Sequence, residues 1–382
     1  MNGSIMALSL RKEQPSPKPQ TTAKVKKARA VSSLRKSSGS RPVVGLDIEP
    51  GRIVAAEVTV NGSLRLARAA TIDLPIGVVR DGEVVDVAQV ATALKQLWSE
   101  HKLGREVRIG VANAKIVVRT IDVPPVTDKA EIAAAVRQVA ADELPMPLDS
   151  AVLDYHPLGI VDTPAGPRQR VVLVAARKEM VEALLAAVTA AGLKPRGVDL
   201  SAFAMIRVLG GGRPDSALYL SVGGMTNLAV VVDGVCTFTR VTGAGLEGMG
   251  IELAERRGLT LDHARMWLRS VGFETPLEDI DGDREIIADA RAVLAEGTRR
   301  LATEVRASLE FHQTQAVTTV DVERAVLTGT AVSVPGFAEA LAAELGMPVQ
   351  PRSVEAAKDA DGLLDLAGVT VAAGLAVEEV SA

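Results

Sequence analysis

The sequence predicts a duplicated α/β protein with two related domains, and three observations carry that prediction. Two apolar strand–turn–strand segments with glycine in or beside the turn lie far apart, at 43–58 and 218–232. Each segment continues into a third strand and is followed by stretches with helical spacing. The 382 residues, of which 47% are apolar, suffice for two or three domains with cores of their own.

The first half begins as a meander of three strands. Val44, Leu46 and Ile48 alternate onto one face, a second strand covers 53–60, and Asn61-Gly62 predicts a tight turn into a third strand at 64–70. Apolar residues at helical spacing then predict a helix over 86–101, which Gly104 ends.

A mixed segment at 105–196 follows, and we expect it to form a compact inserted subdomain. It begins with strands at 107–112 and 116–123, which Pro124 and Pro125 end. Asp128 is placed to cap a helix that runs to Asp142. The remaining expected elements are a connector at 144–148, strands at 151–158 and 170–176, and a helix at 178–191 with Gly192 at its C-cap.

The second half repeats the meander and adds helices. A hinge at 197–199 and a short helix at 200–209 lead to Gly210-Gly211-Gly212, the expected crossing point between the halves. After the second hairpin we expect a strand at 235–241, helices at 246–257, 261–270 and 284–315, a strand at 325–328, and helices at 336–345 and 366–377. The predicted domains are a first core at 42–104 and 197–212, the insert at 105–196, a second core at 213–242 and 318–382, and a helical subdomain at 243–317.

Charge separates the first 41 residues from the rest. Residues 1–41 carry ten Lys or Arg and one acid, Glu13, which gives about +9, whereas the remainder is acidic. A tail rich in Ser, Pro, Lys and Gln cannot bury a core, so we expect it to be disordered, or alternatively to contact anionic lipid or an acidic partner. Nucleic-acid binding is disfavoured because no aromatic residue is interleaved for base stacking.

The composition also excludes several classes of protein. The single cysteine, Cys236, cannot form an internal disulfide, no Cys/His cluster has zinc-ligand spacing, and no apolar run approaches the ~18 residues of a membrane span. Cytoplasmic placement is the natural expectation.

In this order and spacing, the segments resemble the actin-like ATPase superfamily, whose fold is duplicated and ribonuclease H-like. Within it the chain is most similar to the type IV pilus assembly protein PilM family, which is related to the cell-division protein FtsA. The resemblance covers about 43–379. The stretches that carry it are Gly45-Leu46-Asp47-Ile48, 142–148, Leu153-Asp154-Tyr155, Val198-Asp199, Thr226-Asn227-Leu228, Phe238-Thr239-Arg240, Leu327-Thr328-Gly329, 334–337 and 373–376.

The resemblance implies a site for ATP and Mg²⁺ between the halves, with the two hairpins gripping the phosphates. Asp47 would hold Mg²⁺ through water, or alternatively would cap the turn at Pro50-Gly51. Asp199 is the weak candidate to orient a water molecule for hydrolysis, or alternatively a cap residue. The implied nucleotide-binding residues are Asp47, Glu49, Gly51, Arg52, Ser221, Gly223, Gly224, Thr226, Asn227, Gly243, Gly245, Gly329 and Thr330.

This sequence departs from the family pattern at the expected phosphate loops. Glu49 and Pro50 stand where the family has glycine and small hydroxyl residues, Ser221 replaces an aspartate, and Thr330 replaces a glycine of the adenosine loop. Proline removes a backbone donor and glutamate adds negative charge beside phosphate. We therefore expect a scaffold that binds ATP weakly or not at all and hydrolyses it poorly.

The resemblance also implies partners. The insert would help form a groove for the short cytoplasmic N-terminal peptide of a PilN-like inner-membrane protein, which would bring the chain to the membrane face. Other components, such as the assembly ATPase, and a homo-oligomer are further expectations. The implied groove residues are Val117, Val118, Arg119, Pro124, Leu144 and Pro145.

Two other functions remain open from the sequence. One is an active enzyme of the same superfamily, either an ATPase or a sugar kinase, although no local signature of a sugar pocket is present. The other is a filament-forming cytoskeletal protein like FtsA. FtsA typically ends in an amphipathic membrane helix, whereas residues 378–382 form a short acidic segment, so the sequence disfavours this function. The adaptor of type IV pilus assembly, or of a related secretion system, is the leading prediction.

Overall fold

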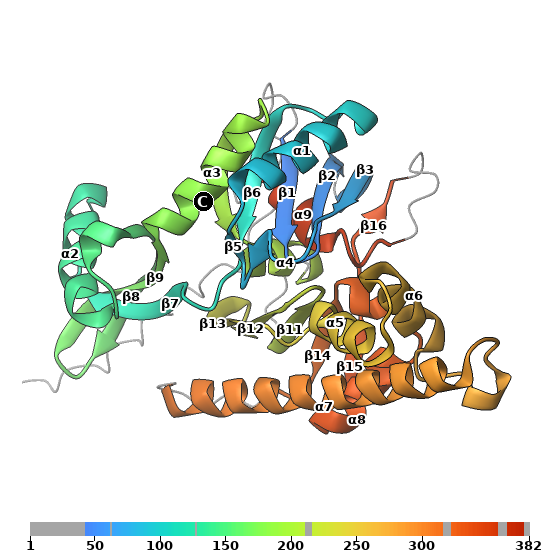
Figure 1. Cartoon of the computed structure of the whole chain (residues 1–382). Coiled ribbons are helices and arrows are strands. Elements are labelled where there is room, and N and C mark those ends of the chain that lie inside the picture. The colour runs from blue at the N-terminus through green and yellow to red at the C-terminus, as the bar shows by residue number, and fades with distance from the viewer. Residues whose placement is uncertain are drawn as a thin grey trace, which may run out of the picture.

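The computed structural model describes residues 43–61, 63–126, 128–210, 216–315, 322–357 and 365–377. The predictions for the basic tail, for Gly62, for Gly211 and Gly212 of the crossing point, and for 378–382 lie outside these residues. Two central sheets with helices around them form the body of the molecule, and a smaller sheet with one helix stands to the side (Figure 1). In the described part of the chain, no helix combines the length and the apolar character needed to cross a membrane.

The first central sheet has the order β10-β6-β1-β2-β3-β16. Its antiparallel meander is β1 (Val44–Glu49), β2 (Arg52–Asn61) and β3 (Ser63–Asp73), as the sequence predicted. The parallel strands β6 (Glu106–Val111) and β10 (Lys194–Leu200) extend it beyond β1. Helices α1 (Val87–His101) and α3 (Lys178–Ala190) pack together over it, and their buried leucines and valines join its apolar core.

The second central sheet has the order β13-β12-β11-β14-β15 and repeats the topology of the first. The meander is β11 (Ala217–Val222), β12 (Thr226–Val232) and β13 (Val235–Thr242). The parallel strands β14 (Ala325–Thr328) and β15 (Val349–Pro351) lie beyond β11. The duplication that the sequence predicted is therefore confirmed, strand for strand, in the five-stranded part of each sheet.

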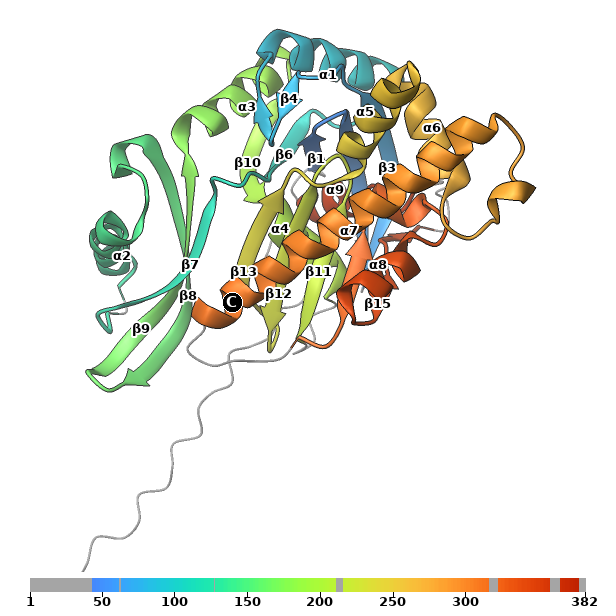
Figure 2. The same cartoon turned by 60° about the horizontal axis from the view of Figure 1, so that its bottom comes forward.

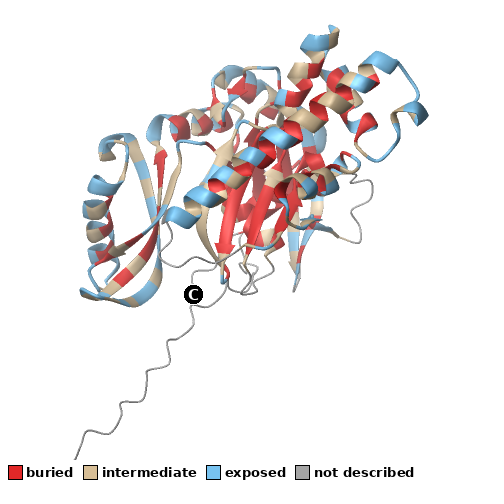
Figure 3. Ribbon diagram, turned by 90° about the horizontal axis from the view of Figure 1, so that it is seen from below, coloured by how far each residue is buried: buried red, intermediate tan, exposed pale blue. Residues whose placement is uncertain are grey.

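The second meander is followed by α5 (Leu246–Arg257), α6 (Leu261–Val271), α7 (Arg284–Gln315) and, after β14, α8 (Phe337–Leu345). The long helix α7 runs across the bottom of the molecule in Figure 1, next to α8. Its predicted apolar stripe is buried at Ile287, Val293, Leu294, Leu301 and Val305. Figure 3 shows the resulting alternation of buried and exposed residues along this helix and the largely buried central strands behind it.

The side subdomain consists of β7 (Val117–Val123), α2 (Lys129–Glu143), β8 (Ala151–Thr163) and β9 (Gly166–Arg177). Its sheet has the order β7-β9-β8, and α2 buries Ile132, Val136 and Ala140 against it. The Asp128 side chain accepts hydrogen bonds from the first backbone N–H groups of α2, as expected of an N-cap. Figure 2 shows this subdomain projecting away from the central sheets.

The observed grouping differs from the predicted insert boundaries at both ends. Strand β6, helix α3 and the first three residues of strand β10 fall within 105–196 but belong to the first central sheet and its helical cover. The reason is burial, because Val107 and Ile109 of β6 are fully buried beside β1. Short strands that lack an alternating pattern were not predicted: β4 (Val79–Arg80), β5 (Glu83–Val84), β15, and β16 (Glu355–Ala356), which pairs with β3.

Two short helices join the halves. Helix α4 (Ser201–Leu209) packs against α9 (Thr370–Leu375), which is shorter than the helix predicted at 366–377. A Cβ atom on Gly374 would lie 2.1 Å from the Ala204 carbonyl oxygen, and one on Gly45 of β1 would lie 1.8 Å from the Ala372 carbonyl oxygen. Glycine therefore lets α9 contact both β1 and α4 at backbone distance, so that the C-terminal segment is part of the core.

Candidate functional site

The two predicted hairpin turns face each other where the central sheets meet. A Cβ atom on Gly224, in the β11–β12 turn, would lie 2.2 Å from the Pro50 carbonyl oxygen of the β1–β2 turn. One on Gly245, where α5 begins, would lie 2.7 Å from the Gly224 carbonyl oxygen. These backbones are thus in direct contact, and only glycine fits at the second turn. We call the two turns together the clamp.

The Glu49 side chain lies between the two turns of the clamp and hydrogen-bonds to both of them. It is 8% exposed, and one carboxylate oxygen accepts a hydrogen bond of 2.5 Å from Arg52 Nε. The other oxygen accepts a hydrogen bond of 3.1 Å from the backbone N–H of Gly224. Arg52 is held in turn by the Gly368 carbonyl oxygen, at 2.9 Å from Nη2. A carboxylate of this chain therefore occupies the donors that a glycine turn would offer to a phosphate oxygen.

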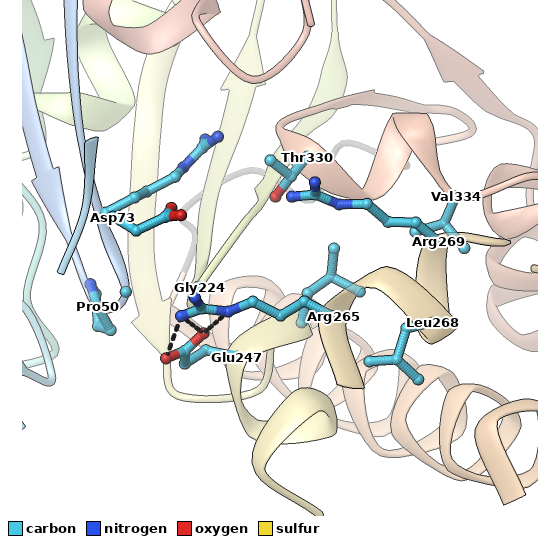
Figure 4. A pocket seen from close by; sticks show the side chains of 12 residues that line it. Pro50, Asp73, Gly224, Glu247, Arg265, Leu268, Arg269, Thr330 and Val334 are labelled. Carbon is cyan, nitrogen blue, oxygen red and sulfur yellow. Dashed lines mark hydrogen bonds and ion pairs between the residues drawn. The ribbon is translucent and has the colours of Figure 1, made fainter. Parts of the chain in front are cut away.

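A small cavity remains beside the clamp, with a volume of about 50 Å³. Its walls are Pro50, Gly51, Arg52, Asp73, Gly224, Leu246, Glu247, Arg265, Leu268, Arg269, Thr330 and Val334. Figure 4 shows Glu247 and Arg265 meeting across it, in an ion pair of 2.6 Å. Sites for small molecules usually measure roughly 300–1,000 Å³, which is larger than this cavity.

The sequence prediction missed several residues of this cavity. Asp73, Glu247, Arg265 and Arg269 all line it. Glu247 could have been found, because it lies in the first turn of the helix that follows the Gly243–Gly245 segment. Arg265 and Arg269 could not have been found in this way. Two arginines four positions apart are common on surface helices, and this spacing does not indicate which distant residue either one contacts.

The predicted Mg²⁺ residue, Asp47, lies near the end of β1 and accepts a hydrogen bond of 3.2 Å from Ser201 Oγ. Burial, followed by the charge of Glu49, raises the pKa of Asp47 to about 7. The turn at Pro50-Gly51 supplies no hydrogen bond to it that the structure records, so Ser201 replaces the alternative capping partner. Ser221 is half-buried in β11 and adds no charge. Within the described ranges no group of three His, Cys, Asp or Glu side chains could hold a metal.

The raised pKa of Asp47 predicts a pH dependence of stability. The folded-state pKa of about 7 exceeds the ordinary aspartate value of 3.8, so the folded protein binds a proton at Asp47 between these pH values and is stabilised as the pH falls through that window. From pH 8 to pH 5 this group alone should add roughly 2–3 kcal/mol to the free energy of unfolding. Urea unfolding at both pH values measures it.

Asp47→Asn is the matched variant for that measurement, because asparagine keeps an acceptor for Ser201 Oγ but does not titrate. We expect its free energy of unfolding to exceed that of the wild type at pH 8 and to change less between pH 8 and pH 5. Equal slopes for both proteins would show that Asp47 is not the titrating group.

Asp199 has local partners for both carboxylate oxygens. One accepts a hydrogen bond of 2.8 Å from the Leu200 backbone N–H, and the other pairs with Arg207 Nη2 at 2.9 Å. Arg207 also donates to the Gly374 carbonyl oxygen, at 2.8 Å from Nη1. These contacts tie the end of β10 to α4 and α9. Asp199 does not cap α4, because the N-cap residue of that helix is Leu200 and no side chain caps it.

The remaining predicted nucleotide residues divide between the clamp and its surroundings. Gly329 has φ of +89°, and a Cβ atom there would lie 2.5 Å from the Val222 carbonyl oxygen, so it packs directly on the second turn. The Thr226 hydroxyl donates to the Ala244 carbonyl oxygen at 2.6 Å and faces the start of α5. Gly243 and Asn227 instead line a second cavity.

The second cavity has a volume of about 390 Å³ and lies where β13 meets the connection from β6 to β7. We call it the β13 cleft. Its walls are Val111, Ala112, Asn113, Ala114, Ile116, Leu200, Ala202, Asn227, Phe238, Thr239, Arg240, Val241, Thr242, Gly243 and Phe311. Its size falls within the range of roughly 300–1,000 Å³ that is usual for small-molecule sites.

The six predicted groove residues are distributed over the side subdomain and line neither of these two cavities. Val117, Val118 and Arg119 lie on β7, where Val118 packs against the core of the first sheet and Arg119 pairs with Glu143 at 3.0 Å. Leu144 packs inside the subdomain core, and Pro124 and Pro145 are exposed. Among the described strands, β7 pairs only with β9, so its other edge is open.

Comparisons with known proteins agree with this architecture. A family model described as type IV pilus assembly protein PilM matches residues 45–378. The chain is similar to a solved structure described as a PilM–PilN type IV pilus biogenesis complex, with 28% sequence identity, a TM-score of 0.71, and coverage of 88% of this chain and 98% of that chain.

Two more distant structures show the fold alone. Ethanolamine utilization protein EutJ from Carboxydothermus hydrogenoformans has 19% identity and a TM-score of 0.51, with coverage of 88% of this chain and 89% of that one. MreB 5 of Spiroplasma citri bound to AMPPNP has 12% identity and a TM-score of 0.50, with coverage of 88% and 95%. The actin-like fold class that the sequence predicted is therefore confirmed.

Proposed function

The chain belongs to the family of type IV pilus assembly protein PilM, and from this premise we propose that it is a pilus assembly adaptor that binds a short peptide of a PilN-like inner-membrane protein. The observation that carries the proposal is the family match over residues 45–378 together with the similarity to the PilM–PilN complex. Membrane association would then come through the partner.

The open edge of β7 supports an extended peptide as the ligand. An edge strand presents unpaired backbone N–H and C=O groups, to which a second extended chain can add as a further strand. Strand β7 starts beside β13, directly after Ile116 of the β13 cleft (Figure 2). A peptide added to this edge would therefore run from the side subdomain toward the cleft.

The closed clamp supports an adaptor rather than an ATPase. Glu49 fills the anion position at the second turn, and the cavity beside it is about 50 Å³. Neither a terminal phosphate nor a base has room unless the clamp opens. We propose that Mg-ATP binds weakly or not at all and that the actin-like body serves as a rigid frame for the peptide site.

A pull-down tests the adaptor function. The purified full-length chain, immobilised, should retain a peptide that spans the cytoplasmic N-terminus of the PilN-like protein encoded in the same genome. A scrambled peptide of the same composition is the control. Equal recovery of the two peptides, or recovery of neither, would contradict the proposed function.

A further inference from the structure

Exposed cations gather at the end of the first central sheet where β1, β6 and β10 begin. Lys102 follows α1, Arg105 precedes β6, and Lys194 is the first residue of β10; all three are exposed. The Lys194 backbone N–H donates to the Arg105 carbonyl oxygen at 2.8 Å, so these two cations belong to adjoining segments. We call Lys102, Arg105 and Lys194 the basic edge.

The charges of the basic edge are not neutralised inside the protein. Among the described residues, none of the three cations forms an ion pair, and Arg105 Nη1 donates only a long hydrogen bond of 3.4 Å to the Gly192 carbonyl oxygen. Glu106, the acid next to them, pairs instead with Arg196 at 3.5 Å. A cation after a helix complements the helix dipole, which accounts for Lys102 but not for Lys194, the first residue of a strand. The basic edge is therefore available to an anionic partner outside the chain.

The basic tail joins the folded body at the same end of the sheet. Its ten Lys or Arg precede Val43, the first described residue, and β1 begins at Val44. Val44 lies opposite Val107 of β6, and Lys194 of β10 lies opposite Glu106. Because neighbouring strands are about 4.8 Å apart, the tail joins the sheet about 10 Å from the start of β10. The tail and the basic edge thus bring positive charge together on a chain whose remainder is negatively charged.

An extended anionic surface suits this arrangement better than a ligand of defined shape. The three cations line neither of the two cavities described above, and polybasic segments bind anionic lipid headgroups by summed attraction, without a pocket. The negatively charged remainder would be repelled by the same lipids, which turns the basic edge toward them. Glu49 ends β1 at the clamp, and Val111 and Leu200 end β6 and β10 at the β13 cleft, so both cavities would face away from the lipid.

We infer that the basic edge and the tail together form a docking surface for a membrane that contains anionic phospholipid. This surface holds the chain directly against the membrane and orients it with the clamp and the β13 cleft pointing away. The inference goes beyond the proposed function, in which membrane association comes through the PilN-like partner, and does not depend on it.

Co-sedimentation with vesicles tests the docking surface. The full-length protein, without any peptide, is mixed with vesicles of phosphatidylglycerol and phosphatidylcholine in equal parts, or of phosphatidylcholine alone. We expect binding to the first vesicles only, and we expect it to weaken as salt is added, because salt screens exposed charges. The double variant Arg105→Gln/Lys194→Gln should bind the anionic vesicles roughly tenfold more weakly than the wild type.

Two further full-length variants serve as the matched control and as the test of the tail. Lys129→Gln/Arg137→Gln removes the same charge from α2 of the side subdomain, where both residues are exposed, and should bind the anionic vesicles as the wild type does. Lys24→Gln/Lys26→Gln/Lys27→Gln removes charge from the tail and should weaken binding roughly tenfold or more. The edge and α2 variants should melt at the wild-type temperature, because exposed substitutions of this kind change stability little.

Three results would overturn the inference. The first is a wild-type protein that does not bind the anionic vesicles, including one that is retained by immobilised polyglutamate instead, which would indicate an acidic protein partner. The second is an edge variant that binds the anionic vesicles as tightly as the wild type. The third is an α2 variant that loses as much affinity as the edge variant. Each of them leaves the proposed function standing, because the vesicles contain no PilN-like peptide.

Discussion

Replacing Glu49 with alanine should destabilise the protein by about 3 kcal/mol and make its stability respond to nucleotide. The substitution leaves Arg52 and the Gly224 N–H without their carboxylate, and breaking a buried ion pair costs about that much. It also vacates an anion position at a glycine turn. We therefore expect Mg-ATP to raise the melting temperature of Glu49→Ala, because a ligand that binds only the folded state stabilises it, and to leave the wild type unchanged.

A second buried glutamate in the same sheet provides the control. Glu57 is also 8% exposed, pairs with Arg68 at 2.5 Å and accepts a hydrogen bond from the Gly104 N–H at 2.9 Å. Glu57→Ala should cost less stability, because the Arg68 side chain is 55% exposed, and should gain no response to Mg-ATP. Two results would contradict the claim that Glu49 occupies the anion position at the second turn. One is a wild-type melting temperature that rises with Mg-ATP, and the other is a Glu49→Ala melting temperature that does not.

Gly45→Ala should destabilise the protein by about 3 kcal/mol or more, because its Cβ atom would lie 1.8 Å from the Ala372 carbonyl oxygen. The clash is with helix backbone, so a side-chain rotation cannot relieve it and α9 must move away from β1. Thermal unfolding followed by circular dichroism measures the loss.

Gly248→Ala is the matched control for the glycine substitution. Gly248 lies in α5 with nothing within 4 Å of a Cβ atom, so alanine should stabilise the protein by about 0.5–1 kcal/mol through helix propensity alone. An equally mild effect of Gly45→Ala would mean that α9 does not pack on β1.

The fold was accessible from the sequence because its signals are local and repeated. Alternation in the two meanders, the Asp128 cap and the apolar stripe of α7 each follow from residues a few positions apart. The sequence did not allow β6 to be allocated to the first sheet, since strands of similar composition compete for partners and pairing joins residues far apart in the chain. Strands of two or three residues, such as β15 and β16, are too short to show alternation.

The sequence indicated which segments form the candidate site, but not which of their side chains contact one another. The sequence marked Glu49 as a departure beside the expected phosphates, yet its hydrogen bond to Gly224 spans 175 residues. The same holds for Glu247 and Arg265, which meet only because α5 and α6 pack together. Asn227 was identified as a nucleotide residue by resemblance, whereas its unpaired amide is visible only when its neighbours are placed.

One titration tests the central claim most directly: the labelled PilN-like peptide against the full-length wild-type protein, without nucleotide and with Mg-ATP in excess. An adaptor with a closed clamp predicts saturable binding with the same dissociation constant in both conditions. Binding that appears only with Mg-ATP, or no binding in either condition, would contradict it.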